Sequence, residues 1–297
     1  MKTSILRITL LAALALFLGG SLQAATLLTY TDQFTLASGN LPYGGVRNPL
    51  PTNVPAPDTT ALQWANTTRS GFPGSFRIVD SDGAHGGVLQ ADDSAGGFSL
   101  NYATNVDLAQ TTAYTTEGGS ELLWSVSFDL NRNGNTYNWF RLYMNYDPVT
   151  GTGLSIEFAL GNGTIKISEN SVASATLGNP GVILGNTGLW GSFTFERYAD
   201  GTLRIVKTSG GGSGAGTDLD ETITLSNSSY TTGGTMAVSF LGNSSTPNPL
   251  WVDNITLRVM PIPEPGAFAF IALGGLGLLV LLRGRSRGGR AGQQSFS

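Results

Sequence analysis

The chain has 297 residues, enough for one large domain or two small ones. Charged residues make up 12% of it, about half the usual share for a soluble domain, and its 41 glycines are roughly twice the average usage. With no cysteine and a single histidine, His85, the sequence excludes a disulfide framework, a thiol nucleophile, a zinc finger and a multi-histidine metal site.

The charges are unevenly distributed along the chain. The first 25 residues and the last 32 contain basic residues but no acidic ones. Residues 26–265 therefore contain ten basic and all 20 acidic residues, a net charge of −10. Because nucleic-acid binding needs clustered Lys and Arg, an acidic body with scattered basic residues is predicted not to bind nucleic acid.

Residues 1–25 are predicted to form a helical secretory signal peptide. Lys2 and Arg7 supply a positively charged start, residues 8–18 form an apolar run, and small residues at 24–25 offer a cleavage site. A buried N-terminal helix is the alternative, but such a helix would need a polar face, which this run lacks. The sequence therefore predicts that the body is exported.

Four carboxylates occur close together near residue 80, at Asp80, Asp82, Asp92 and Asp93. Calcium prefers oxygen ligands, so these residues are candidate metal ligands. An EF-hand is excluded, because the twelfth position counted from Asp80 is Ala91. Solvated turns are the alternative interpretation, since short Asp-Gly runs are typical of turns. The sequence otherwise indicates no cofactor.

Between residues 26 and 260 the sequence shows many short alternating runs bounded by turn residues, the pattern of strands. Four runs, at 122–130, 139–146, 236–240 and 251–259, alternate in this way, so every second residue of each run is predicted to lie on the same face of a strand. The residues predicted to share those faces are Leu122, Trp124, Val126, Phe128 and Leu130; Phe140, Leu142, Met144 and Tyr146; Met236, Val238 and Phe240; and Trp251, Asp253, Ile255, Leu257 and Val259.

The opposite face of the 139–146 run is a candidate sugar-binding surface. It is predicted to carry Trp139, Arg141, Tyr143 and Asn145. Aromatic faces can stack on the C–H surfaces of sugars, while Arg and Asn can form hydrogen bonds with hydroxyl groups. The alternative is that a second sheet or a loop covers this face.

For two hairpins the sequence predicts which residues lie opposite each other on the paired strands. A two-residue Asn162-Gly163 turn would place Phe158 opposite Ile167. In the second hairpin, a two-residue loop would place two arginines opposite each other, which is repulsive. A three-residue loop with Gly201 in the left-handed region instead pairs Glu196 with Arg204, and is preferred.

A glycoside hydrolase is the enzymatic alternative, and it needs two carboxylates across one cleft. The glutamates on predicted strands are Glu121, Glu157 and Glu196. They occur singly, without the closely spaced Glu and Asp runs of jelly-roll glucanases, and Glu196 already has a predicted partner in Arg204. The sequence therefore predicts a protein that is not an enzyme.

The last part of the chain combines four features in order: a Pro-Glu-Pro motif, a short apolar run, an arginine cluster and the end of the chain. Pro263-Glu264-Pro265 is followed by an uncharged apolar run at 267–282, then by Arg283, Arg285 and Arg287. Sixteen residues of helix span about 24 Å, short of the ~30 Å hydrocarbon core, although a terminal arginine can extend the span. The run is predicted to be a single transmembrane helix with its arginines in the cytoplasm.

This order of features at 261–290 closely resembles the PEP-CTERM sorting signal of Gram-negative bacteria. The resemblance implies that an exosortase recognises and processes the tail at the inner membrane. Release or transfer to the cell surface is then expected, often in species that make exopolysaccharide. An ordinary single-pass anchor is the alternative. Residues 291–297 are expected to be a disordered tail.

The body, residues 26–260, is predicted to be one all-β domain, an antiparallel two-sheet sandwich. Its pattern resembles the concanavalin-A-like jelly rolls that often accompany this sorting tail. The protein is therefore expected to be a non-catalytic, exported component of the surface or extracellular matrix. A structural or exopolysaccharide-associated role is preferred, and a lectin-like carbohydrate-binding module is the alternative.

Overall fold

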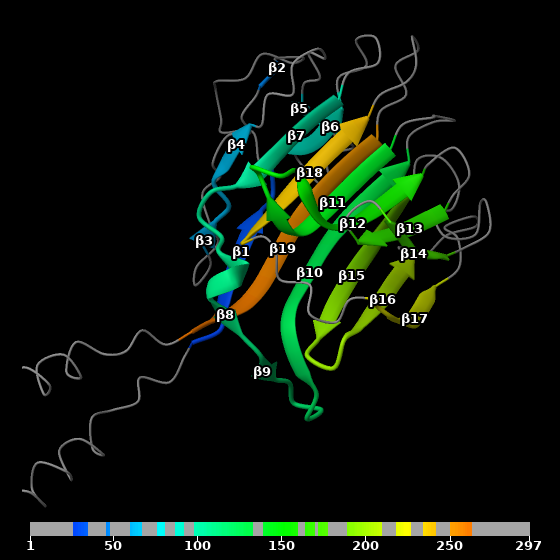
Figure 1. Cartoon of the computed structure of the whole chain (residues 1–297). Helices are drawn as coiled ribbons and strands as arrows, with labels where there is room; N and C mark the ends of the chain where they lie inside the picture. The colour runs from blue at the N-terminus through cyan, green and yellow to red at the C-terminus, as the bar shows by residue number, and fades with distance from the viewer. Residues whose placement is uncertain are drawn as a thin grey trace, which may run out of the picture. The chain divides into compact units, whose positions relative to one another are not determined.

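In the computed structural model, the described residues are 26–34, 46–47, 60–66, 76–80, 87–91, 98–132, 139–159, 164–169, 172–177, 189–209, 218–226, 234–241 and 250–262. Within the unit formed by residues Leu27–Pro261, these residues form two sheets (Figure 1). The described part of the chain contains a single short 3-10 helix, Leu108–Gln110. The predicted all-β, two-sheet architecture is confirmed.

One sheet has seven strands, all paired antiparallel. In spatial order they are β14 (Val172–Leu177), β13 (Thr164–Glu169), β12 (Thr152–Ala159), β11 (Trp139–Asp147), β18 (Thr235–Leu241), β7 (Phe98–Ala103) and β4 (Trp64–Asn66). We refer to it as the seven-stranded sheet.

The other sheet has twelve strands. Its main path is β17 (Leu219–Thr224), β16 (Thr202–Ser209), β15 (Trp190–Tyr198), β10 (Glu121–Arg132), β19 (Leu250–Pro261), β6 (Gly87–Ala91), β5 (Phe76–Asp80) and β2 (Val46–Arg47). Short strands join it at the side: β1 (Leu28–Asp32), β3 (Thr60–Ala61), β8 (Thr111–Thr112) and β9 (Tyr114–Thr115). The β1–β3 pair is parallel.

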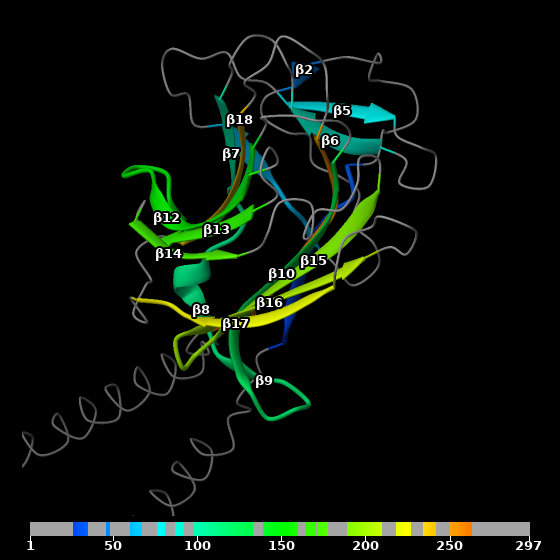
Figure 2. The same ribbon diagram turned by 90° about the vertical axis from the view of Figure 1, so that its right-hand side faces the viewer.

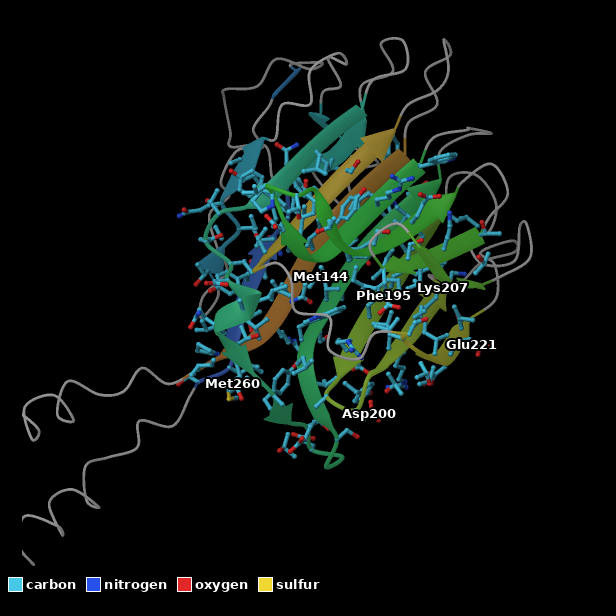
Figure 3. The ribbon with its side chains drawn as sticks, viewed as in Figure 1. Met144, Phe195, Asp200, Lys207, Glu221 and Met260 are labelled. Carbon is cyan, nitrogen blue, oxygen red and sulfur yellow. The ribbon has the colours of Figure 1, made fainter. Side chains whose placement is uncertain are left out.

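The two sheets pack face to face around one apolar core. Phe158 of the seven-stranded sheet contacts Phe128, Phe193 and Phe195 of the other, and Phe140 contacts Phe128, with ring centroids 5.0 to 6.0 Å apart. All four of these contacts between the sheets are edge-to-face, an arrangement that aromatic quadrupoles favour. Figure 3 labels Met144 and Phe195, two core residues from different sheets.

Both sheets are curved (Figure 2). The seven-stranded sheet bends so that its outer face, the face turned away from the other sheet, lies on the inside of the bend. Sheet curvature of this kind follows from strand twist and from bulges. The outer face of the seven-stranded sheet is therefore a concave surface.

Two of the sequence predictions are confirmed in detail. All five residues predicted to share a face of the 122–130 run are buried in the core. The β15–β16 hairpin pairs Phe195 with Ile205 and Glu196 with Arg204, and Gly201 has φ +98°. The hairpin therefore has the three-residue loop that keeps the two arginines apart.

Two other predictions are wrong. The β12–β13 pair places Phe158 opposite Ile165, not Ile167, because four residues rather than two connect the paired strands. A shift of two residues keeps each side chain on its face, so the core is unaffected. In β19, Trp251 does not share a face with Ile255, because Asn254 adopts φ +53° and the pairing with β10 shifts between Ser127 and Asp129.

β11 contains an irregularity near its end that changes which side chains its outer face carries. The pairing with both neighbouring strands shifts by one residue between positions 143 and 147, and Asn145 has φ +51°. This is a β-bulge, which reverses the alternation of side chains beyond it. Gly153 lies across from the bulge, where a Cβ would come within 3.2 Å of the Met144 carbonyl oxygen. A glycine at 153 therefore leaves room for the bulge.

The predicted signal peptide at 1–25 and the tail at 291–297 lie outside the described residues, as does the predicted sorting signal at 261–290 except for Pro261, which ends β19, and Ile262. The residues outside include Pro263, Glu264, Pro265, Arg283, Arg285 and Arg287. Within the part of the chain that the structure does describe, no helix has the length and apolar character needed to cross a membrane.

Candidate functional site

A row of polar side chains crosses the outer face of the seven-stranded sheet. Lys166 of β13 lies directly opposite Glu157 of β12, Glu157 lies opposite Arg141 of β11, and Arg141 lies opposite Ser239 of β18. Directly opposite residues on neighbouring strands project from the same face, so this row forms a continuous polar band. The flanking residues Ile156 and Leu142 face the core instead.

Arg141 is the centre of this band. Its Nε and Nη2 donate to Oε2 of Glu157, and its Nη1 donates to the Tyr143 hydroxyl at 3.4 Å. Its Cζ lies 5.6 Å from the centroid of the Trp139 ring, within the range of a cation–π contact. Burial lowers the pKa of Arg141, but Tyr143 and Glu157 raise it by more, so the guanidinium remains charged.

The Arg141–Glu157 pair is unequally accessible. The Arg141 side chain is 30% exposed, whereas the Glu157 side chain is 11% exposed. Glu157 is thus held beneath the guanidinium that neutralises it. The pair presents both hydrogen-bond donors and acceptors next to an aromatic ring, with no net charge of its own.

A second row of side chains crosses the same face at Tyr143, two residues further along β11 than Arg141, and this row contains aromatic side chains. Tyr143 lies opposite Ala237 of β18, and Ala237 lies opposite Tyr102 of β7. The small Ala237 is fully buried between the two tyrosines. Tyr146 joins this group, with its ring centroid 5.3 Å from that of Tyr143.

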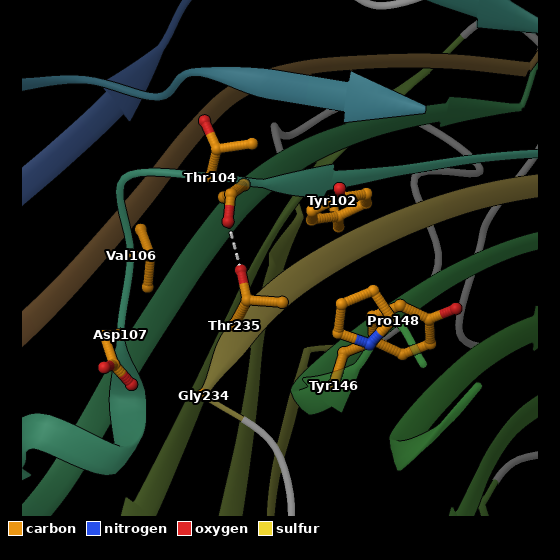
Figure 4. A pocket seen from close by; sticks show the side chains of 9 residues that line it. Tyr102, Thr104, Val106, Asp107, Tyr146, Pro148, Gly234 and Thr235 are labelled. Atoms are coloured by element: carbon orange, nitrogen blue, oxygen red, sulfur yellow. Dashed lines mark hydrogen bonds between the residues drawn. The ribbon is translucent and has the colours of Figure 1, made fainter. Parts of the chain in front are cut away.

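The tyrosines lead into an open hollow of about 430 Å³ at the end of the sheet (Figure 4). We call it the tyrosine hollow. Its lining residues are Tyr102, Ala103, Thr104, Val106, Asp107, Tyr146, Pro148, Gly234 and Thr235. Thr235 Oγ1 donates to the carbonyl oxygen of Ala103, which ties β18 to β7 at the floor of the hollow.

Asp107 fixes one wall of the tyrosine hollow. Its Oδ1 accepts from the backbone N–H of Ala109 at 3.0 Å and so caps the short 3-10 helix. A Cβ on Gly234 would clash with this oxygen. Glycine at 234 therefore allows the cap and the strand to approach each other closely.

Of the four residues predicted to share the sugar-binding face, three do so. Trp139, Arg141 and Tyr143 are partly exposed on the outer face. Asn145 is not on this face, because the bulge turns its side chain into the interior, where Oδ1 accepts from Trp124 Nε1 of the other sheet at 3.3 Å. Tyr146, predicted to face the core with Met144, takes the outer position instead.

Sequence reasoning did not assign Glu157, Tyr102 or Tyr146 to the site. Glu157 could have been found by noting that a lone glutamate alternates with Ile156 and Phe158 and therefore opposes a polar face. Tyr102 and Tyr146 join the site through strand order and the bulge, which no local pattern reveals.

The other candidate sites are not brought together in the described residues. Asp80 ends β5, while Asp82, Asp92 and Asp93 lie outside the described residues. Among those described, no group of three or more metal-ligating side chains occurs. Glu157 belongs to the seven-stranded sheet, whereas Glu121 and Glu196 belong to the other. Glu196 lies opposite Ser125, four residues along β10 from Glu121, and accepts a hydrogen bond from Arg204, so these glutamates are not arranged as a carboxylate pair.

Comparison with solved structures finds proteins of similar fold at low sequence identity. A protein of unknown function from Shewanella oneidensis MR-1 aligns with a TM-score of 0.49 at 14% identity, over 82% of this chain and 90% of its own. Peanut lectin aligns with a TM-score of 0.48 at 10% identity, over 80% and 98%. A carbohydrate-binding module from Bacillus subtilis aligns with a TM-score of 0.39 at 13% identity, over 66% of this chain and 94% of its own.

No protein-family model matches the sequence, and no curated protein matches it either. The similarities to solved structures are too distant to transfer a function to this chain.

Proposed function

We propose that the body of this protein is a non-catalytic carbohydrate-binding module. The observation that carries the proposal is the cluster of Trp139, Arg141 and Glu157, which combines an accessible aromatic ring with a paired donor and acceptor on a concave face. A sugar ring can stack on Trp139 while its hydroxyls bond to the ion pair. Such a partly exposed cluster favours ligand binding over the purely structural role preferred from the sequence.

The same cluster favours a neutral glycan. Glu157 neutralises Arg141 within the site, and the body around it has a net charge of −10. A polyanionic chain would therefore be repelled as it approached, and would find one of the two cations at the polar band already paired. Hydroxyl-rich, uncharged sugars suffer neither penalty.

The test is retention of the protein on immobilised polysaccharides. Trp139→Ala and Tyr143→Ala are each expected to weaken retention on the preferred neutral glycan by about tenfold, the loss of a typical binding hot spot. The matched control is Trp190→Ala, a partly exposed tryptophan on the twelve-stranded sheet, which is expected to leave retention unchanged. Unchanged retention in both site variants, or preferential binding to polygalacturonate, would contradict the proposal.

We also propose that the chain is exported and sorted by its C-terminal signal. Support comes from the sequence alone: the apolar run at 8–18, the Pro263-Glu264-Pro265 motif, the run at 267–282 and the arginines from Arg283 onward. The expected route is transient anchoring at the inner membrane of a Gram-negative bacterium, processing by an exosortase, and delivery to the surface or medium. Mass spectrometry of the mature protein tests this, and an intact C-terminus would favour a plain anchor.

A further inference from the structure

The bulge at Asn145 changes what the outer face offers to a ligand. Without it, Tyr146 would alternate into the core behind Met144. With it, Tyr146 contacts Tyr143 at a ring-centroid distance of 5.3 Å and also lines the tyrosine hollow. Tyr146 is only 4% exposed, so it forms a buried link between Tyr143 on the outer face and the wall of the hollow.

We propose that the tyrosine hollow is a second sugar subsite, and that the ligand is an internal stretch of an unbranched polysaccharide lying along β11. This inference rests on the proposed carbohydrate binding and adds to it the mode of recognition. The first subsite is Trp139 with Arg141 and Glu157. The second is formed by Tyr102 and Pro148, which rest against the buried Tyr146.

The separation of the two subsites requires an extended ligand. Trp139 and Tyr146 are the first and eighth residues of β11. At about 3.3 Å per residue, less a small shortening at the bulge, their positions are about 20 Å apart along the strand. A single sugar ring cannot contact both ends, whereas a chain of several sugar units can.

The hollow combines ring surfaces with polar groups at its rim, the combination that contacts with a sugar require. Tyr102 and Pro148 supply partly or fully exposed ring surfaces, with the buried Tyr146 behind them, and Thr104 and Asp107 supply a hydroxyl and a carboxylate at the rim. Thr104 and Asp107 are exposed. The Thr104 hydroxyl donates to the Gln63 carbonyl oxygen at 3.2 Å and Asp107 Oδ1 caps the 3-10 helix, but a hydroxyl oxygen and a carboxylate can each accept further hydrogen bonds from sugar hydroxyls.

A chain-length series tests the inference. Titration calorimetry would use neutral β-glucan oligosaccharides, cellulose- and laminarin-derived, of two to six units. If two subsites are linked along β11, wild-type affinity is expected to rise at least tenfold between the disaccharide and the pentasaccharide, because the second subsite engages without a new loss of translational freedom. Equal affinity for all lengths would contradict the second subsite but not carbohydrate binding itself.

A substitution in the hollow separates the two subsites. Thr104→Trp places a large side chain at the exposed rim of the hollow, away from the polar band and the sheet core. It is expected to abolish the gain with chain length while leaving disaccharide affinity within twofold of wild type. Thr104→Ser, which keeps the hydroxyl and the open hollow, is the matched control and is expected to retain the gain.

The remaining outcomes are also decisive. If Thr104→Trp keeps the full length dependence while its melting temperature equals that of wild type, the hollow is not a subsite. If the wild-type protein binds no neutral oligosaccharide or polysaccharide of any length, the proposed function itself fails, and the second subsite with it.

Discussion

At the scale of the residue, Asn145 decides both the shape of the core and the composition of the outer face. Its left-handed backbone lets β11 accommodate one extra residue, and its side chain satisfies the indole N–H of the buried Trp124. Asn tolerates this backbone region better than most residues do. One side chain thus performs a conformational role and a hydrogen-bonding role, which two substitutions can separate.

Asn145→Gly keeps the backbone conformation but removes the acceptor for Trp124. It is expected to lower the free energy of unfolding by about 1–3 kcal/mol, the cost of a buried donor without a partner. Asn145→Ala adds the strain of a Cβ at positive φ and is expected to cost about 1–2 kcal/mol more. Urea denaturation of both variants measures the difference, and equal losses would show that the backbone conformation contributes nothing.

At the scale of the element, the β15–β16 hairpin shows how a loop selects a register. Its three-residue loop places Glu196 opposite Arg204, and Arg204 also bonds to Asp220 of β17 at 2.8 Å. The pairs are largely exposed, so each contributes little to stability by itself. The loop geometry therefore matters more, and it depends on Gly201 at φ +98°.

Gly201→Ala is expected to destabilise the protein by about 1–2 kcal/mol, because an L-residue is strained in this backbone region. The matched control is Gly118→Ala, at a turn glycine where an added Cβ would come no closer than 3.8 Å to its nearest neighbour. Thermal unfolding monitored by circular dichroism compares the two. A similar melting temperature for both variants would show that the loop does not need the left-handed glycine.

At the scale of the whole molecule, Asp32 joins the two sheets at one end of the sandwich. Its Oδ2 accepts from Nε1 of Trp64 in the seven-stranded sheet at 2.6 Å, and its Oδ1 accepts from the Phe34 backbone N–H at 2.9 Å. Burial outweighs both hydrogen bonds and raises the pKa of Asp32 to about 7. A carboxyl group held in this way couples stability to pH.

The sign of the coupling follows from the direction of the pKa shift. The unfolded value is about 3.9, so between about pH 4 and pH 7 the folded chain binds more protons than the unfolded one. The contribution of Asp32 to the free energy of unfolding is therefore complete below about pH 4 and is lost as the pH rises through 7. The loss is on the order of a few kcal/mol.

Asp32→Asn should flatten the stability profile between pH 4 and pH 7, because the amide cannot titrate. It should also lower stability at pH 4, since one amide oxygen must then serve two donors. Urea unfolding at several pH values measures the profile, with Glu117→Gln, an exposed turn residue, as the control for loss of a carboxylate. Parallel profiles for wild type and Asp32→Asn would show that Asp32 titrates normally.

The amino-acid sequence alone determined the all-β class, the inward residues of β10 and the β15–β16 register, because alternation and turn chemistry act between near neighbours. It also located Trp139, Arg141 and Tyr143 on one face. Only the tertiary structure decided the positions of Asn145, Tyr146 and Trp251. Each depends on a bulge that forms where strands pair and pack, β11 with β12 and β18 and against Trp124, and β19 with β10, and alternation within one strand does not record those contacts.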